Sequence, residues 1–236
     1  MTKKIKVFTF KDDNKENKFL KDHPYFSQNF SMILVAPTSN GKTQVLYNIL
    51  FDKLFLLDMV KKSKVVAFIP TVKVVNEMAE LCVQNKLSHN DFKIYPRWSE
   101  EECEAEYNKL EKDNINIFIF DDVAFLSNFS HANKRNILDT MLCSGRHKNL
   151  YNIVLTQKYS HLNENMRSNN CSILVFFYGL NGKEHDRIYM EHFSFMNREK
   201  FDNIIIKDNL YQMYQFVLFN KKTNKIYNHE FDEIVI

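Results

Sequence analysis

The sequence predicts an α/β fold: a mostly parallel sheet covered by helices on both faces, with a β-hairpin near the C-terminus. Short, almost wholly apolar segments alternate with helical segments of about a dozen residues. Strands that are buried on both faces read as such continuous apolar runs. Near the C-terminus, two alternating segments, 211–219 and 225–231, flank the polar turn 220–224, which predicts a hairpin added at a sheet edge.

The elements follow one another along the whole chain. Strands are predicted over residues 5–10, 31–36, 65–69, 91–95, 115–120, 151–156 and 172–177. Helices are predicted after Lys42, over 73–83, from Ser99, where Glu102 completes a capping box, and over 132–142. The predicted divisions are an N-terminal strand and linker (1–30), a core (31–180), and C-terminal helices and hairpin (181–236) appended to the same domain.

Length and composition narrow the function classes only slightly. The chain has 236 residues, enough for one domain with a sizeable core, and its formal net charge of +3 neither demands nor excludes nucleic acid. The four cysteines form no C-x-x-C pair, which predicts reduced thiols. No apolar run approaches the ~20 residues of a membrane span, and the first residues have no signal-peptide core. We therefore expect a soluble, cytoplasmic protein without a membrane partner.

The segment 31–50 is the most informative part of the chain. It reads as strand, loop and helix, and the loop ends in Gly41-Lys42-Thr43. Backbone N–H groups of such a loop and the positive end of the helix hold a β-phosphate, the lysine reaches the β- and γ-phosphates, and the threonine hydroxyl ligates Mg²⁺. The predicted nucleotide-binding residues are Ala36, Pro37, Thr38, Ser39, Asn40, Gly41, Lys42 and Thr43.

This loop departs from the usual G-x-x-x-x-G-K-[ST] pattern at its first position, where Ala36 replaces glycine. Alanine fits only if that position keeps an ordinary φ, and Pro37 favours this by holding Ala36 extended. A chance Gly-Lys-Thr triplet is expected in roughly one chain in ten of this length. The flanking strand and helix therefore carry the prediction of a P-loop NTPase fold.

Two acids end the predicted strand 115–120. Ligands of parallel α/β sheets lie at the carboxyl ends of the strands, so Asp121 and Asp122 should emerge beside the phosphate loop. We expect Asp121 to contribute to the Mg²⁺ shell and Asp122 to orient and deprotonate the attacking water. The alternative is a polar pair that merely ends a strand, and Asp122 is shorter than the glutamate found in many such ATPases.

Three further side chains are candidates for catalysis. Gln157 ends the predicted strand 151–156 at the same sheet edge, where its amide could contact the γ-phosphate and the water. Arg146 follows Gly145 near a helix end, where it could act on the phosphate of a neighbouring subunit or simply interact with the helix dipole. Arg167 is a second candidate for this role. His147 and His161 lack further spaced ligands, so a separate metal site is not expected.

These motifs resemble one known family. The segment Gly145-Arg146-His147 before an apolar strand ending in Thr156-Gln157, and the later Met-Arg-Ser-Asn segment (166–169), are similar to the poxvirus-type genome-packaging ATPases, the viral branch of the FtsK–HerA translocases. The resemblance covers about residues 30–180. It implies a RecA-like P-loop fold and an Mg-dependent ATPase in a homo-oligomeric ring that drives double-stranded DNA into a capsid.

The resemblance also implies roles, partners and a location. It assigns phosphate and Mg²⁺ to Lys42 and Thr43, metal and water to Asp121 and Asp122, the sensor role to Gln157, and the trans-acting finger to Arg146, with Arg167 second. It further implies a viral capsid protein as a partner, and a location in the host cytoplasm (the virus factory) or in the virion.

Other functions remain open at this point. A nucleoside or nucleotide kinase of thymidine-kinase-like type also pairs a phosphate loop with an acid-ended strand. Enzymes of that type resemble one another in having paired cysteines, which this sequence lacks. A non-catalytic scaffold would not need the complete set of nucleotide-site residues. Three clusters of lysines are either solvated surface or contacts with DNA. They are Lys3, Lys4 and Lys6; Lys61, Lys62 and Lys64; and Lys221, Lys222 and Lys225.

Overall fold

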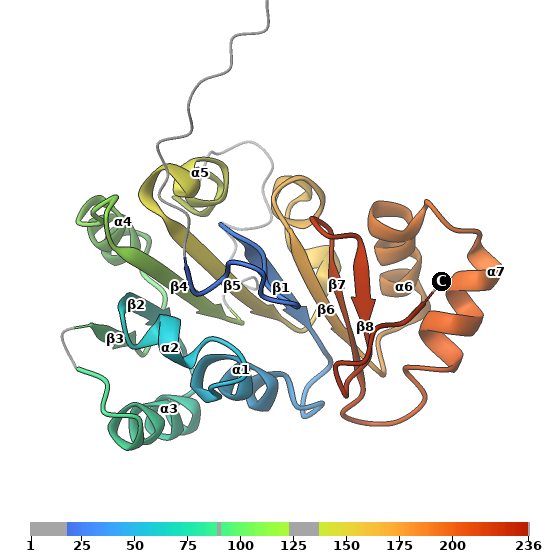
Figure 1. The fold of residues 1–236 in the computed structure, drawn as a ribbon, viewed down its shortest axis with the longest axis horizontal. Helices are drawn as coiled ribbons and strands as arrows, with labels where there is room; N and C mark the ends of the chain where they lie inside the picture. The colour runs from blue at the N-terminus through green and yellow to red at the C-terminus, as the bar shows by residue number, and fades with distance from the viewer. Residues whose placement is uncertain (1–17, 89–90, 123–136, 236) are drawn as a thin grey trace, which may run out of the picture.

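The centre of the computed structural model is one eight-stranded sheet with the strand order β3-β2-β4-β5-β1-β6-β7-β8 (Figure 1). The structure describes residues 18–88, 91–122 and 137–235. The predicted strand 5–10 and the first part of the predicted helix 132–142 lie outside the described residues. Strands β1 to β6 run parallel to one another, whereas β7 is antiparallel to both of its neighbours, β6 and β8. The predicted mostly parallel sheet is confirmed.

The elements have the following bounds. The strands are β1 (Ser31–Val35), β2 (Ser63–Phe68), β3 (Phe92–Tyr95), β4 (Ile115–Asp121), β5 (Leu150–Thr156), β6 (Ile173–Phe177), β7 (Phe216–Asn220) and β8 (Lys225–Tyr227). The α-helices are α1 (Lys42–Phe51), α2 (Leu57–Val60), α3 (Val72–Gln84), α4 (Glu100–Asn108), α5 (Ile137–Ser144), α6 (Gly182–Ile188) and α7 (Arg198–Lys200). Short 3-10 turns, η2 (Gly145–Lys148) and η3 (Tyr159–His161), and π-helical segments, η4 (Asn165–Asn169), η5 (Tyr189–Phe193) and η6 (Phe201–Lys207), complete the chain.

Both faces of the sheet are buried, which explains the continuous apolar strands. Helices α1, α2 and α3 cover one face, and α4, α5 and the C-terminal helical segments cover the other (Figure 1). Along β4 the side chains alternate between the two layers. Ile117 and Ile119 pack toward the α1 layer, while Phe118 and Phe120 pack toward the α5 layer. A parallel strand in this position has no polar face, so its sequence shows no alternation.

Strand β1 is the switch point of the sheet. The chain leaves β1 to build β2, β3, β4 and β5 on one side, and returns to place β6 on the other side. In open α/β sheets the ligand crevice lies at the carboxyl ends of the strands beside such a switch point. The predicted phosphate loop follows β1 and therefore begins at this crevice.

The C-terminal hairpin is present, but its first strand is shorter than predicted. Residues 211–215 form a loop before β7, because the Gln215 side chain caps the turn by accepting hydrogen bonds from the N–H groups of Tyr211 and Gln212 (2.9 and 3.1 Å). Strand β8 ends at Tyr227 rather than at residue 231. The hairpin continues the main sheet through β6 and β7. Within the described ranges, no helix is long and apolar enough to cross a membrane.

Candidate nucleotide site

The loop between β1 and α1 has the backbone that a phosphate loop needs. Ala36 is fully buried, is not among the residues with positive φ, and donates its N–H to the carbonyl of Thr156 (3.2 Å). The left-handed conformations fall instead at Ser39 (φ 64°) and at Gly41 (φ 87°), the N-cap of α1. The loop therefore tolerates alanine at its first position. Gly41 has a positive φ that would strain any other residue, and a Cβ there would lie 3.1 Å from Cδ1 of Tyr214, so glycine suits this position.

The two acids lie beside the loop lysine, as the sequence predicts. Asp121 is the last residue of β4 and is 5% exposed, and Asp122 follows in a left-handed conformation (φ 50°). The Lys42 ammonium, which is itself buried, lies 3.2 Å from Oδ1 of Asp122. One carboxylate and one ammonium are thus fixed at the N-terminus of α1.

Gln157 connects these acids to the loop. Its Nε2 donates to Oδ2 of Asp122 (2.9 Å), and its Oε1 accepts from the hydroxyl of Thr38 (2.9 Å). Strand β5, which Gln157 follows, lies between β4 and β1. The predicted placement of Gln157 is confirmed, but the bond to Thr38 was not predicted, because no short-range pattern links residues 38 and 157.

A single hollow of about 270 Å³ unites these residues with Thr71 and Val74. Thr43 and Asp121 both line it, and they offer the hard oxygen ligands that Mg²⁺ takes alongside phosphate oxygens. Burial, together with the neighbouring charge of Asp122, raises the pKa of Asp121 to about 6, and Lys42 opposes this shift. A divalent cation would favour the ionised carboxylate, so the donor set fits Mg²⁺. The part of the chain that the structure describes contains no cluster of three or more His, Cys, Asp or Glu residues that could hold a metal ion by themselves.

Arg146 lies at the opposite end of the sheet from the phosphate loop. It belongs to η2, directly before β5, and its side chain is exposed. The strand that separates it from Gln157 has seven residues, which corresponds to about 20 Å. The structure therefore does not bring Arg146 to the nucleotide site of its own chain. Its predicted role in a neighbouring subunit remains a prediction.

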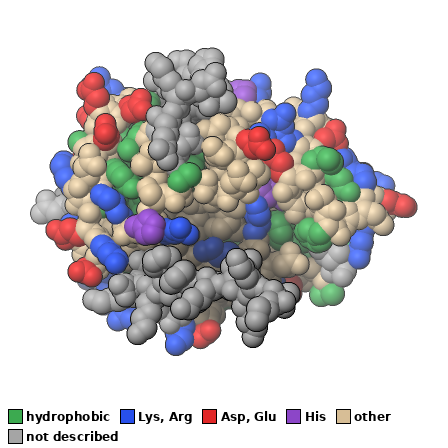
Figure 2. All heavy atoms as spheres, turned by 90° about the horizontal axis from the view of Figure 1, so that it is seen from above, with side chains coloured by type: hydrophobic (Ala, Val, Ile, Leu, Met, Phe, Trp, Pro, Cys, Tyr) green, Lys and Arg blue, Asp and Glu red, His purple; other side chains and the backbone are tan. Residues whose placement is uncertain are grey.

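Arg146 lines a cleft at the amino ends of β1, β5 and β6. This basic cleft has a volume of about 460 Å³, and its other cations are Lys221 and Lys222 from the turn after β7. No carboxylate side chain is among the described residues that line it. Figure 2 looks onto this end of the molecule and shows Lys and Arg side chains around the hollow near the middle of the view. Lys225, predicted in the same cluster, instead pairs with Glu233 (2.7 Å).

Arg167 has a partner inside its own chain. It is 7% exposed, its Nη1 lies 2.5 Å from Oε1 of Glu191, and its guanidinium covers the Tyr159 ring at 5.5 Å from the centroid. The Tyr159 hydroxyl donates to the same glutamate (2.7 Å) and contacts Nε2 of His192 (2.6 Å). In this conformation Arg167 links η4 to η5. Its predicted action on a neighbouring subunit is untested.

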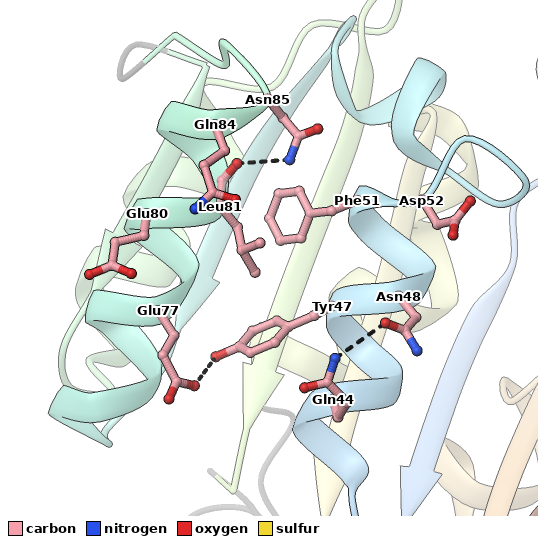
Figure 3. A pocket seen from close by; sticks show the side chains of 10 residues that line it. All are labelled: Gln44, Tyr47, Asn48, Phe51, Asp52, Glu77, Glu80, Leu81, Gln84 and Asn85. Atoms are coloured by element: carbon pink, nitrogen blue, oxygen red, sulfur yellow. Dashed lines mark hydrogen bonds between the residues drawn. The ribbon is translucent and has the colours of Figure 1, made fainter.

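A larger groove lies outside the predicted site, between α1 and α3 (Figure 3). Tyr47, Phe51 and Leu81 project into it, and the Tyr47 hydroxyl donates to Glu77 (3.1 Å). Three acidic residues, Asp52, Glu77 and Glu80, line this groove, and no lysine or arginine is among the described residues that line it, although Lys73 pairs with Glu77 (3.7 Å). Its charge opposes phosphate binding, whereas the smaller hollow beside the loop contains the Lys42 ammonium.

Comparison with protein families identifies the chain. A family model described as Poxvirus A32 protein matches residues 16–187, which is more than half of the sequence. The chain belongs to the poxvirus A32 family. The resemblance to viral packaging ATPases of the FtsK–HerA type is thereby confirmed, and the kinase alternative is not favoured. A search of curated proteins found no match.

Solved structures with a similar fold include two viral proteins. The DNA-packaging ATPase B204 from Sulfolobus Turreted Icosahedral Virus aligns with a TM-score of 0.64 and 15% identity over 86% of this chain and 98% of B204. B204 from Sulfolobus turreted icosahedral virus 2, in complex with AMPPCP, gives 0.63 and 15% over the same shares. The pCW3 conjugation coupling protein TcpA aligns at 0.52 and 11% over 81% of this chain and 57% of TcpA. At these identities the comparison supports the P-loop fold.

The raised pKa of Asp121 predicts a pH-dependent effect of Asp121→Asn on stability. The folded protein holds this proton more tightly than the unfolded chain, whose aspartate has the ordinary pKa of 3.8, so ionisation destabilises the fold as pH rises from about 4 to 6. Asparagine cannot ionise. Asp121→Asn should therefore raise the free energy of unfolding by about 1–3 kcal/mol at pH 7.5, with little effect at pH 4.

Urea denaturation at both pH values measures this difference. Exposed Glu230 provides the control, since Glu230→Gln should change the free energy of unfolding by less than about 0.5 kcal/mol at either pH. An equal effect of Asp121→Asn at pH 4 and pH 7.5 would contradict the role of burial.

Proposed function

We propose that this A32 family member is an ATP-driven double-stranded DNA translocase that packages a viral genome into a preformed capsid. Family membership and the P-loop fold support an ATPase of the viral packaging type. The observation that best supports coupled hydrolysis is the side chain of Gln157, which bonds both to the phosphate loop at Thr38 and to the second strand-end acid, Asp122.

The residues of the hollow suggest a division of roles in ATP hydrolysis. Lys42 neutralises charge on the β- and γ-phosphates, and the N-terminus of α1 contributes backbone N–H groups. Asp122 lies at the edge of the same hollow and would orient the attacking water and accept its proton. Thr43 and Asp121 would hold Mg²⁺, which neutralises charge on the phosphate oxygens when bound.

Asp122 contacts both Lys42 and Gln157, which suggests how hydrolysis is sensed. Phosphate oxygens would compete with Asp122 for the Lys42 ammonium, which lies 3.2 Å from the carboxylate. A carboxylate released by Lys42 keeps its hydrogen bond from Gln157. The amide would therefore follow any movement of Asp122 and transmit it to Thr38 in the loop.

A ring of identical subunits would complete the site. Because Arg146 lies at the end of the sheet opposite its own phosphate loop, it can act on a nucleotide only from a neighbouring subunit. In a head-to-tail ring, the amino ends of the strands of one subunit approach the carboxyl ends of the next. Such a contact gives Arg146 access to the developing phosphate charge.

The basic cleft is also the described surface best suited to DNA phosphates. Burial lowers the pKa of Lys222, whose ammonium donates to the carbonyl of Gln28, and Lys221 donates to the carbonyl of Ser168 (2.7 Å). Carbonyl partners leave the charges of both lysines uncompensated, unlike that of Lys225. A ring would repeat these two lysines around a central duplex, while Arg146 faces the neighbouring subunit. The same proposal includes a viral capsid protein as a partner of the ring and a location in the virus factory or the virion.

The first experiment is steady-state ATP hydrolysis with and without linear double-stranded DNA, at low and moderate salt. The proposal expects Mg-dependent hydrolysis that DNA stimulates. Lys42→Ala should reduce hydrolysis at least about 100-fold, because it removes a charge-assisted contact with the phosphates. Hydrolysis indifferent to DNA would contradict a translocase, and phosphoryl transfer to an added nucleoside would restore the kinase alternative.

Mixing two inactive variants tests the composite site. Arg146→Ala subunits keep an intact phosphate loop, and Lys42→Ala subunits keep the arginine. A mixed ring therefore contains some complete sites. Activity should recover to about one quarter of wild type at a 1:1 ratio if subunits assort randomly and each site needs one neighbour. Arg187→Ala, which removes another exposed arginine, should remain active by itself. No recovery at any ratio between folded variants would argue against composite sites.

Loss of the cleft lysines should weaken DNA binding in a salt-dependent way. The double variant Lys221→Ala/Lys222→Ala removes two phosphate contacts per subunit, so the slope of log affinity against log salt should fall by about 2 per bound subunit. Lys225→Ala is the matched control, because its charge already pairs with Glu233. Fluorescence anisotropy from 50 to 200 mM salt measures the slopes. Equal slopes for the double variant and wild type would place the DNA elsewhere.

A further inference from the structure

Four large apolar side chains are exposed next to the phosphate loop. They are Tyr178 (37% exposed), Tyr211 (60%), Met213 (51%) and Tyr214 (62%), and we call this group the aromatic rim. Tyr178 directly follows β6, and the other three belong to the loop before β7. In Figure 1 that loop passes beside the connection between β1 and α1, at the carboxyl ends of the parallel strands.

Two residues of the aromatic rim, Tyr178 and Tyr214, contact the phosphate loop. A Cβ atom built on Gly41 would lie 3.1 Å from Cδ1 of Tyr214, so this ring approaches the residue that precedes Lys42. Asn40 donates from Nδ2 to the carbonyl of Tyr178 (2.7 Å). A nucleotide whose phosphates bind the loop therefore has the aromatic rim as a neighbour.

The loop that carries the aromatic rim is held by buried hydrogen bonds. Gln215 is 2% exposed, and its Oε1 accepts from the N–H groups of Tyr211 and Gln212. Its backbone carbonyl accepts from the N–H of Tyr178 (3.0 Å), which joins both segments of the aromatic rim. The exposed rings thus stand on a fixed backbone, as a binding platform requires.

Tyr214 also has a strained backbone. Its φ of 71° is a conformation that bulky side chains seldom adopt. Local strain of this kind persists only where surrounding contacts enforce it, and it concentrates at functional sites. Here it sets a largely exposed tyrosine against the phosphate loop, where folding alone gains little from the ring.

We propose that the aromatic rim is the platform for the base of the bound nucleoside triphosphate. This inference rests on the proposed ATPase function, since it needs the phosphates in the loop. The phosphates bind at the N-terminus of α1, and the ribose and base must extend from there across adjoining surface. Tyrosine rings offer a face on which a base can stack. Stacking is tolerant of base identity, so ATP and GTP should bind with affinities within about tenfold of each other.

The test compares ATP with inorganic tripolyphosphate, which fills the loop but has no base. Tyr214→Gly removes the ring and suits the positive φ, so the variant keeps its fold. Tyr214→Gly and Tyr211→Ala should each weaken ATP binding about 5- to 50-fold and leave tripolyphosphate binding unchanged. Tyr214→Phe should keep ATP affinity. The control Phe195→Ala removes an exposed ring that contacts Phe219 near the other end of β7 and should leave both affinities unchanged.

Isothermal titration calorimetry of the full chain distinguishes the outcomes. Unchanged ATP affinity in both tyrosine variants would overturn the inference while leaving the ATPase proposal intact. Equal weakening of ATP and tripolyphosphate would also overturn it, by showing that the rings only support the loop. A wild-type chain that binds neither ligand would overturn the ATPase proposal and the inference together. If the tyrosine variants lost self-association but kept their ATP affinity, the aromatic rim would be a contact with a second copy of the chain, and the inference would be overturned.

Discussion

The carboxylate of Asp122 is the point on which the arrangement of the site depends. One oxygen faces the Lys42 ammonium, and the other accepts from the Gln157 amide. Three different segments therefore meet at one side chain: the phosphate loop, the end of β4 and the end of β5. Lys42 is buried, and Asp122 and Gln157 are half-buried, so an unpaired Lys42 ammonium would carry a desolvation penalty. The network fixes the relative position of the strand ends before any ligand contributes.

The parallel sheet makes this meeting possible. Adjacent parallel strands end at the same edge, and the order β4-β5-β1 puts the Gln157 strand between the other two. Complete burial of β5 on both faces leaves it no freedom to shift its register, since a slip of one residue would exchange the side chains of the two layers. The geometry of the polar site is thus a consequence of the apolar packing behind it.

Much of this could be predicted from local sequence patterns. Apolar runs located the parallel strands, and their ends located Asp121, Asp122 and Gln157, because a strand end needs no information about distant residues. Contacts between distant segments could not be predicted. The packing of Tyr214 against Gly41 joins residues far apart in the chain, and no periodicity links them.

One predicted strand is shorter than expected, and one candidate residue has a partner that the sequence did not indicate. The segment 211–215 alternates like a strand, but the Gln215 amide caps the local backbone and turns it into a loop. Arg167 looked similar to Arg146 as a candidate finger, yet it is buried against Glu191, a partner that sequence spacing does not reveal. Side chains that bond to backbone or to distant acids override patterns read from hydrophobicity.

The opposite positions of the basic cleft and the nucleotide hollow have a consequence for assembly. Arg146 belongs to the turn η2 shortly before β5, and Gln157 directly follows Thr156 at the strand's other end. A two-fold dimer formed through the cleft would pair like surfaces, with two sets of cations facing each other. A head-to-tail contact instead brings Arg146 of one subunit to the nucleotide phosphates of the next. Under the proposed function, a closed ring makes this contact in every subunit. Each composite site then combines the carboxyl end of β5 of one subunit with the amino end of β5 of its neighbour.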